Sequence, residues 1–193
     1  PNHKPVIPFQ KQNYALTDNQ LVIKSAKYVI DSPLLLPKGY TLVLSEGTEI
    51  DLVNKSYILI YGALRSIGHA EAPNMITSSD QSAQGVTIIQ ADEKSTLAYT
   101  TIDNLNTLEE NEWQMTGAIT FYESDVDMVN VTIRHNHCED ALNVIRSKFN
   151  ISKLNINHTF ADGFDGDFCK GTLTDSYFHH TGNDAVDYSG SVV

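Results

Sequence analysis

A repeat of 22 to 23 residues fills the second half of the sequence and restricts the fold more than any other feature. The repeat begins at four segments of similar pattern: residues 117–121, 140–144, 162–166 and 184–188. Their first residues are 23, 22 and 22 positions apart. Apolar residues keep this register between the segments, as in the column Met128, Ile151 and Leu173. A fixed period with matching apolar columns is the signature of a solenoid.

The length of the repeat favours strands over helices. Each unit contains short segments of alternating apolar residues, separated by Gly, Asn, Asp, Ser and Thr, and none is long enough for an amphipathic helix. Helical repeats need more than about 30 residues, and the Leu-x-x-Leu-x-Leu pattern of leucine-rich repeats is absent. We therefore predict an all-β fold, a right-handed parallel β-helix with coils of about 22–23 residues.

The charge of the chain excludes several classes of partner. The 193-residue chain has a formal net charge of -11, which disfavours nucleic acid and an anionic membrane surface. An acidic polysaccharide would need a bridging cation for the same reason. No run of about 18 apolar residues occurs, so we expect no membrane insertion. Plentiful small polar residues indicate an extracellular or periplasmic location.

The two ends of the sequence differ from the repeat. Residues 1–27 are irregular and polar, and we expect them to lead into the β-helix or to cap its first coil, because an open β-helix presents unpaired backbone groups. The β-helix domain is expected over residues 28–193. An opening without Met or a signal peptide is expected of a processed protein or an excised fragment. We also expect the β-helix to continue past Val193, or to self-associate at an open C-terminal coil.

A series of short motifs follows in the first half of the sequence. Apolar strand segments at residues 28–30 and 58–60 enclose Leu36-Pro37-Lys38-Gly39 and Leu44-Ser45-Glu46-Gly47-Thr48-Glu49-Ile50, and Tyr61-Gly62-Ala63-Leu64 follows. This order resembles the opening coils of the pectate-lyase-like right-handed parallel β-helix superfamily. The resemblance covers residues 28–193 and implies that fold, without implying an activity.

Strand alternation predicts two columns of polar residues outside the coils. Phe164 and Val186 should point inward, so the residues after them point outward. The outward column contains Thr120, Asn143, Asp165 and Asp187, and a corner column contains Asp140, Asp162 and Asp184. Coils about 4.8 Å apart would stack these carboxylates, which raises a pKa or requires a cation. Corner aspartates that accept backbone N–H groups in turns are the alternative.

Two chemical interpretations of the acidic cluster remain open. Carboxylate oxygens suit Ca²⁺, and the cluster resembles the acidic calcium site of one pectate lyase family. That resemblance implies calcium ligands at Asp162, Asp165, Asp184 and Asp187, although Asn183 stands where the family has Asp. The second interpretation is hydrolysis by a catalytic carboxylate pair, Asp165 and Asp187. The Gly-His-Gly segment of polygalacturonase-type β-helices is absent.

Three further residues are candidates for substrate binding. Asn143 lies in the outward column and Arg146 follows it, although an exposed basic side chain is the ordinary interpretation of Arg146. Trp113, the only tryptophan, belongs to an insertion over residues 105–116 that interrupts the register. Such insertions often build binding sites, and the alternative is a ring that covers an apolar edge.

A histidine column accompanies the acidic ones. His135, His158 and His180 are 23 and 22 residues apart, so they should stack at one corner. Stacked parallel rings do not converge on one metal ion, so we expect a structural stack.

The sequence supports two hypotheses about function. The first is a carbohydrate-active protein, a lyase or hydrolase of an extracellular acidic polysaccharide, with Ca²⁺ at the acidic cluster. The second is a non-catalytic β-solenoid for surface display, adhesion or assembly, in which the aspartates only build turns. A basic residue or an acid pair converging on the outward column distinguishes them.

Overall fold

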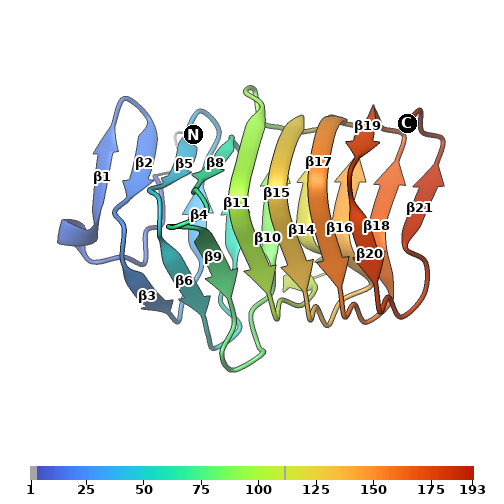
Figure 1. Cartoon of the computed structure of the whole chain (residues 1–193). Helices are drawn as coiled ribbons and strands as arrows, with labels where there is room; N and C mark the ends of the chain where they lie inside the picture. The colour runs from blue at the N-terminus through green and yellow to red at the C-terminus, as the bar shows by residue number, and fades with distance from the viewer. Residues whose placement is uncertain (1–3, 111) are drawn as a thin grey trace.

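Parallel strands stack along one axis through the computed structural model, from the N-terminal to the C-terminal end (Figure 1). The structure describes residues 4–110 and 112–193. It is 56% strand and 2% helix, and the strands form a β-solenoid of about seven turns. The prediction of an all-β parallel β-helix is confirmed. No helix in the described part of the chain is long and apolar enough to cross a membrane.

Two large sheets form the walls of the stack. The seven-stranded sheet contains β4 (Leu34–Leu36), β7 (Ile58–Ile60), β10 (Val86–Ile89), β14 (Gly117–Tyr122), β16 (Asp140–Ile145), β18 (Asp162–Asp167) and β21 (Val186–Ser189). The twelve-stranded sheet contains β1 (Tyr14–Thr17), β2 (Gln20–Ile23), β3 (Lys27–Ile30), β5 (Thr41–Leu44), β6 (Glu49–Leu52), β8 (Leu64–Ile67), β9 (Asn74–Thr77), β11 (Ser95–Asp103), β15 (Val126–Arg134), β17 (Lys148–Asn157), β19 (Lys170–Thr174) and β20 (Tyr177–His179).

Three smaller elements complete the described chain. They are the 3-10 helix η1 (Lys11–Asn13) and the strands β12 (Leu108–Glu110) and β13 (Trp113–Met115). The parallel ladder begins at Gln20, because β2 pairs with β5, so it starts earlier than the boundary predicted at residue 28. Strand β1 pairs with β2 in the antiparallel direction. It covers the edge that β2 would otherwise expose.

Non-glycine residues in the left-handed conformation build the corners of the coils. One corner carries Gln90, Glu123, Arg146 and Phe168, with φ between 48° and 51°. Another carries Asn104, His135, His158 and His180, with φ between 52° and 59°. The long strands β11, β15 and β17 bend at Tyr99, Asn130 and Lys153, with φ between 46° and 53°. A residue in the left-handed conformation turns the chain sharply. Because such residues occur at equivalent positions of successive coils, each coil turns at the same corner.

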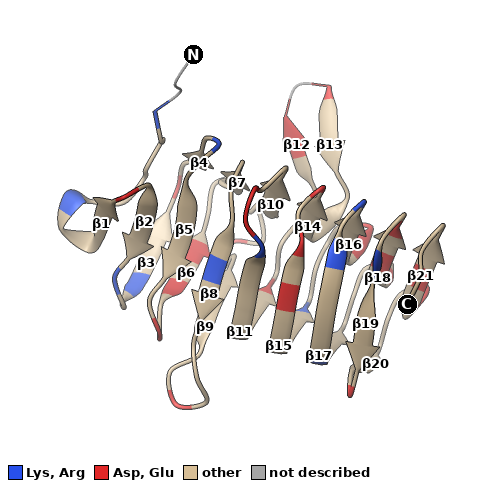
Figure 2. Ribbon diagram, turned by 90° about the horizontal axis from the view of Figure 1, so that it is seen from above, with Lys and Arg blue, Asp and Glu red and all other residues tan. Residues whose placement is uncertain are grey.

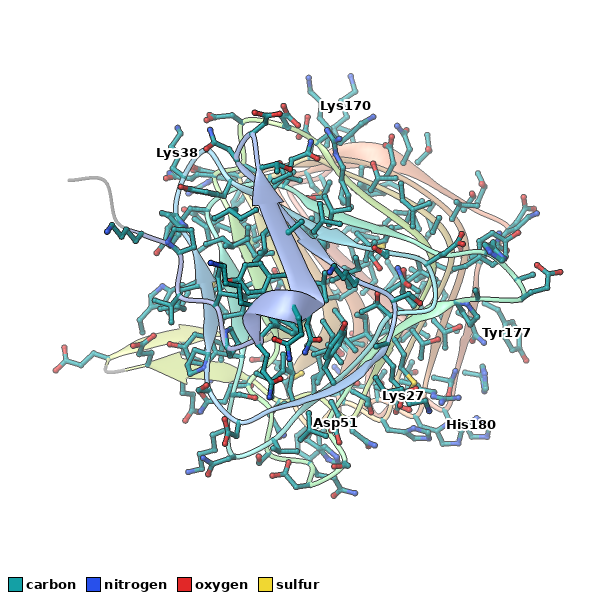
Figure 3. All side chains as sticks on the ribbon, turned by 90° about the vertical axis from the view of Figure 1, so that its left-hand side faces the viewer. Lys27, Lys38, Asp51, Lys170, Tyr177 and His180 are labelled. Atoms are coloured by element: carbon teal, nitrogen blue, oxygen red, sulfur yellow. The ribbon has the colours of Figure 1, made fainter. Side chains whose placement is uncertain are left out.

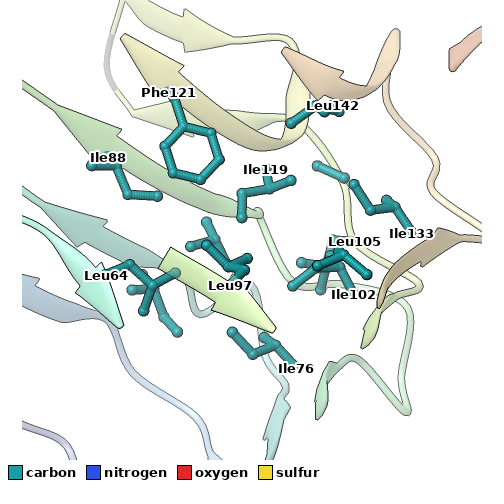
Figure 4. Close-up of a cluster of buried hydrophobic side chains, with 14 of the residues drawn as sticks. Leu64, Ile76, Ile88, Leu97, Ile102, Leu105, Ile119, Phe121, Ile133 and Leu142 are labelled. Atoms are coloured by element: carbon teal, nitrogen blue, oxygen red, sulfur yellow. The ribbon is translucent and has the colours of Figure 1, made fainter. Parts of the chain in front are cut away.

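The predicted inward columns form the core. Ile119, Leu142 and Phe164 are register partners on successive strands, and all are fully buried. Figure 4 shows how Ile119 and Phe121 meet Leu97 from the opposite wall. In the next inward column Val144, Gly166 and Tyr188 follow one another. A Cβ on Gly166 would lie 2.6 Å from Tyr188 Cδ1, so the missing side chain makes room for the tyrosine ring.

The predicted insertion folds into a β-hairpin, β12 with β13, that projects from the stack (Figure 2). Leu108 and Met115 of the hairpin are buried in a small apolar cluster outside the main core, together with Tyr57, Leu59 and Ile89. Tyr57 Oη also donates a 2.6 Å hydrogen bond to a hairpin carboxylate. These contacts anchor the hairpin over β7 and β10 on the outer face of the seven-stranded sheet.

Candidate functional site

One column of polar residues runs along the outer face of the seven-stranded sheet, as the alternation predicts. Register pairing joins Thr87, Thr120, Asn143, Asp165 and Asp187 on successive strands. Exposure increases along this column toward the C-terminal end. Thr87, Thr120 and Asn143 are buried, whereas Asp165 is half-buried and Asp187 is exposed. The acidic side chains therefore lie where the column becomes accessible, on β18 and β21 (Figure 2).

The side-chain amide of Asn143 joins two carboxylates of this face. Its Nδ2 donates to Asp140 Oδ2 at 2.8 Å and to Asp165 Oδ2 at 2.9 Å. Thr116 Oγ1 donates a second hydrogen bond to Asp140 Oδ2, at 2.7 Å. Asn143 is only 3% exposed. The structure thus places this predicted substrate-binding residue beneath the carboxylates, where it positions them.

Asp165 is the most perturbed carboxyl of the cluster. Burial, followed by the charges of Asp140, Asp167, Asp187 and Asp162, raises the pKa of Asp165 to about 7. Burial also raises the pKa of Asp140. Within the described chain, no Lys or Arg forms an ion pair with these carboxylates. Asp165 therefore holds a proton near neutral pH, which few surface carboxyls do.

Two predicted calcium ligands have other surroundings. Asp162 Oδ1 accepts hydrogen bonds from the Asp184 backbone N–H at 2.9 Å and from Asn183 Nδ2 at 2.8 Å. This is the turn-forming role considered for the corner column. Asp184 itself is exposed. Over residues 4–110 and 112–193, no three His, Cys, Asp or Glu side chains form a group ready to hold a metal ion.

In the described chain, the side chains of the other predicted substrate-binding residues form no hydrogen bond or ion pair with the acidic cluster. Arg146 stands at a left-handed corner, where its Nη1 donates to Tyr122 Oη at 3.0 Å and its guanidinium lies 6.0 Å from the Phe168 ring centre. Trp113 is on the hairpin, over the N-terminal half of the sheet. Thr116 and Asp140 also belong to the site, although neither was predicted as a site residue. Thr116 ends the insertion, so no repeat register points to it.

The histidine column forms a stack at one corner, as predicted. The rings of His158 and His180 are 4.7 Å apart and nearly parallel, and those of His135 and His158 are 5.1 Å apart. His135 Nδ1 also lies 2.9 Å from Asp103 Oδ1, while Asp103 Oδ2 accepts two hydrogen bonds from Arg134. Since His and Asn are enriched in the left-handed conformation, corner geometry accounts for this column.

Acid should weaken the fold through this stack. Desolvation, followed by the neighbouring histidines, lowers the pKa of His158. The unfolded chain then binds the proton more readily, so stability is lost as pH falls through the ordinary histidine value of about 6.5. We expect His158→Asn, which copies Asn104 in the same column, to reduce the loss of stability between about pH 8 and about pH 5. The midpoints of urea unfolding at the two pH values measure this loss. If the difference between the two midpoints is the same in His158→Asn and in the unmodified protein, the prediction is contradicted.

Comparisons of the chain with protein-family models, with curated proteins and with solved structures found no match. The resemblance to the pectate-lyase-like superfamily therefore stays a prediction. The chemistry of the site follows from its own side chains.

Proposed function

We propose that the protein hydrolyses an extracellular polysaccharide at the acidic cluster of the seven-stranded sheet, with Asp165 as general acid and Asp187 as its carboxylate partner. The observation that carries the proposal is the half-buried Asp165, whose pKa is raised to about 7 beside other carboxylates. A general acid must hold its proton at the working pH, and glycosidases obtain this by burial and by neighbouring negative charge.

The two carboxyl groups would divide the reaction between them. Asp165 would protonate the glycosidic oxygen as its bond to the anomeric carbon breaks. Asp187, the exposed register partner of Asp165 on the adjacent strand, would activate water or attack the anomeric carbon. Asn143 would hold the Asp165 carboxyl through its 2.9 Å hydrogen bond, as a positioning residue.

Hydrolysis fits the cluster better than elimination by a lyase. A lyase needs a base near the proton that it removes, and Arg146 is the basic residue nearest in register. Its guanidinium bonds to Tyr122 Oη, and its nearest carboxylate partner is Glu123 at 3.9 Å. By contrast, Asp165 and Asp187 are register partners on adjacent strands. An acid pair is therefore available within the described residues, without a basic partner.

A depolymerisation assay on a panel of acidic and neutral polysaccharides tests the proposal. Hydrolysis releases new reducing ends without ultraviolet absorbance, whereas elimination leaves an absorbing carbon–carbon double bond in the product. We expect reducing ends alone. Products that absorb ultraviolet light would show that the reaction is elimination and not hydrolysis. If no polysaccharide of the panel is cleaved, the catalytic proposal is contradicted.

Calcium is a competing proposal for the same cluster, because an ion bound to Asp165 would keep that carboxyl ionised and so remove its role as general acid. Asp162, Asp165, Asp184 and Asp187 offer the oxygen ligands that Ca²⁺ prefers, and the buried Asn143 Oδ1 has no hydrogen-bond partner. A bound cation would offset the repulsion between the carboxylates. We expect millimolar Ca²⁺ to raise the unfolding midpoint by a few degrees over a chelator control, and Asp165→Asn/Asp187→Asn to remove the increase. An equal midpoint in both buffers would exclude calcium.

Assembly is a second candidate function. Strand β21 ends the seven-stranded sheet of the described chain and pairs there with β18. Large apolar side chains are exposed at this end, including Tyr177 at 65% and Val192 at 65%. An exposed strand edge with apolar neighbours can pair with another copy. Sedimentation over a range of protein concentrations tests this, and a single monomeric species throughout would count against it.

A further inference from the structure

Two hollows adjoin on the outer face of the seven-stranded sheet, over β4 and β7. The larger has a volume of about 540 Å³ and extends to Lys4 and Lys38. The smaller has a volume of about 300 Å³ and is walled by Trp113. Leu59 and Tyr61 line both hollows. The two are therefore parts of one groove, which we call the β4–β7 groove, and their volumes are those of ligand sites.

Both walls of the β4–β7 groove are held in place. On one side, the hairpin is anchored by its buried apolar side chains and by the Tyr57–Glu110 hydrogen bond. On the other side, Val6 exchanges two backbone hydrogen bonds with Leu35 of β4, at 2.9 and 3.0 Å. Figure 3, viewed along the stack, shows the hairpin and Lys38 on the same side of the solenoid. The groove is thus formed without a ligand.

The floor and one wall present aromatic faces to solvent. Tyr61 is 41% exposed and Trp113 is 39% exposed, and both line the smaller hollow with Leu59 and Glu110. The Glu110 carboxylate accepts the hydrogen bond from Tyr57 Oη. Such exposed rings offer a large rigid surface with a polar tip. The C–H faces of sugar rings pack on surfaces of this kind, while the hydroxyl groups stay in water.

The opposite end of the groove is basic. Lys4 and Lys38 line it on a chain with a net charge of -11. Lys38 Nζ lies 3.1 Å from Asp92 Oδ1, but both side chains are about two-thirds exposed, so this pair leaves the ammonium group open to a ligand. A ligand with carboxylates at that end would complement the two lysines.

A column of side chains leads from the groove toward the acidic cluster. Tyr61 follows β7 directly, in the column that continues by register pairing as Ile89, Tyr122, Ile145 and Asp167. Asp167 lies two residues beyond Asp165 on the same face of β18. Four strand spacings of about 4.8 Å separate β7 from β18, or about 19 Å. Ile89 of this column is buried against the hairpin, so an extended oligosaccharide that spans this distance would pass beside the hairpin.

We infer that the β4–β7 groove binds an acidic oligosaccharide, a chain of uronic acid units whose sugar faces pack on Trp113 and Tyr61 and whose carboxylates meet Lys4 and Lys38. This inference rests on the proposed function for its substrate class, because the groove would hold the remote end of the chain that reaches Asp165. Binding energy from such a remote part lowers KM and raises kcat/KM for long chains.

The only tryptophan of the chain lies in this groove, so its fluorescence reports binding there directly. Uronic-acid oligosaccharides of increasing length, and length-matched neutral glucose oligosaccharides, are titrated into the Asp165→Asn protein, which does not consume them. We expect saturable fluorescence changes with the acidic series alone, weakened by salt. Equal responses to the neutral series, or no response to either series, would overturn the inference.

Substitutions locate the binding. By calorimetry, Tyr61→Ala and Lys38→Gln should each weaken binding by about tenfold. Two matched controls should leave the affinity unchanged: Tyr177→Ala on β20 and Lys94→Gln in the loop before β11. Lys94, like Lys38, is an exposed partner of an aspartate. If Tyr61→Ala and Lys38→Gln bind as tightly as the control variants, the binding site is not the β4–β7 groove. Binding without cleavage by the unmodified protein would refute the proposed catalysis and leave the groove intact. Cleavage with an unchanged kcat/KM in Tyr61→Ala would support the proposed catalysis and refute binding at the groove.

Discussion

Replacing Asp165 by Asn is expected to reduce polysaccharide hydrolysis by about a hundredfold or more and to stabilise the fold above neutral pH. Asn has the shape of the carboxyl group but cannot donate the proton of a general acid, which accounts for the loss of activity. The hydrogen bond from Asn143 Nδ2 is retained if the new side-chain oxygen replaces Asp165 Oδ2. The activity loss is measured as kcat on the substrate found in the depolymerisation assay.

The stability effect of Asp165→Asn depends on pH. The pKa of Asp165 is raised to about 7 in the native state from the ordinary value of about 3.9. The native protein therefore holds a proton that the unfolded chain has lost between these values, and stability falls as pH rises through that window. After a discount for solvent screening of this half-exposed group, the Asn variant should gain about 1 kcal/mol at about pH 8, or about 2–4 °C.

A comparison with Asp175→Asn controls for the change in net charge. Asp175 is exposed on the other sheet, at a left-handed position that Asn tolerates. This control should keep full activity and show no gain in stability at high pH. If Asp165→Asn remains fully active, the general-acid role is excluded. If it loses stability at about pH 8, the raised pKa is excluded as well.

Phe164→Ala is expected to cost about 3–5 kcal/mol of folding free energy, the largest stability loss that we predict. The Phe164 side chain is fully buried, with its ring centre 5.3 Å from those of Phe149 and Tyr188. Its removal leaves a cavity beside these two rings. The unfolding midpoint should fall by about 10 °C, and limited proteolysis should begin in the C-terminal coils.

Phe168→Ala is the matched control, four residues later on the same chain. Phe168 is 64% exposed, so its removal should change stability by no more than about 0.5 kcal/mol. Thermal unfolding of both variants under the same conditions gives the comparison. Equal midpoints for the two variants would show that Phe164 does not face the core.

The repeat register of the sequence was sufficient to predict the ladder. In a solenoid each residue meets its counterpart in the next coil, so a fixed period specifies neighbours without knowledge of long-range folding. The columns through Phe164 and Asp165 were predicted in this way, and the register pairs confirm them. The histidine stack was predicted for the same reason.

Exposure within these columns could not be read from the period. Alternation assigns Asn143 and Asp165 to the same outer face, yet Asn143 is 3% exposed and Asp165 is half-buried. Thr116 bonds to Asp140 and covers this part of the face, and Thr116 belongs to the insertion, which has no counterpart in other coils. The perturbed pKa of Asp165 depends on this burial, so the sequence could indicate crowded carboxylates but not which of them holds a proton.

The amino-acid sequence by itself determined the solenoid, the columns of the core and the acidic face, because all of these depend on contacts between equivalent positions of adjacent coils. The tertiary structure decided the site. It placed Asn143 between two carboxylates and turned Arg146 toward Tyr122. It also set Trp113 of the hairpin beside Tyr61, which lies 52 residues earlier in the chain. These contacts depend on how side chains orient within a coil and on the insertion, and the period of the repeat specifies neither.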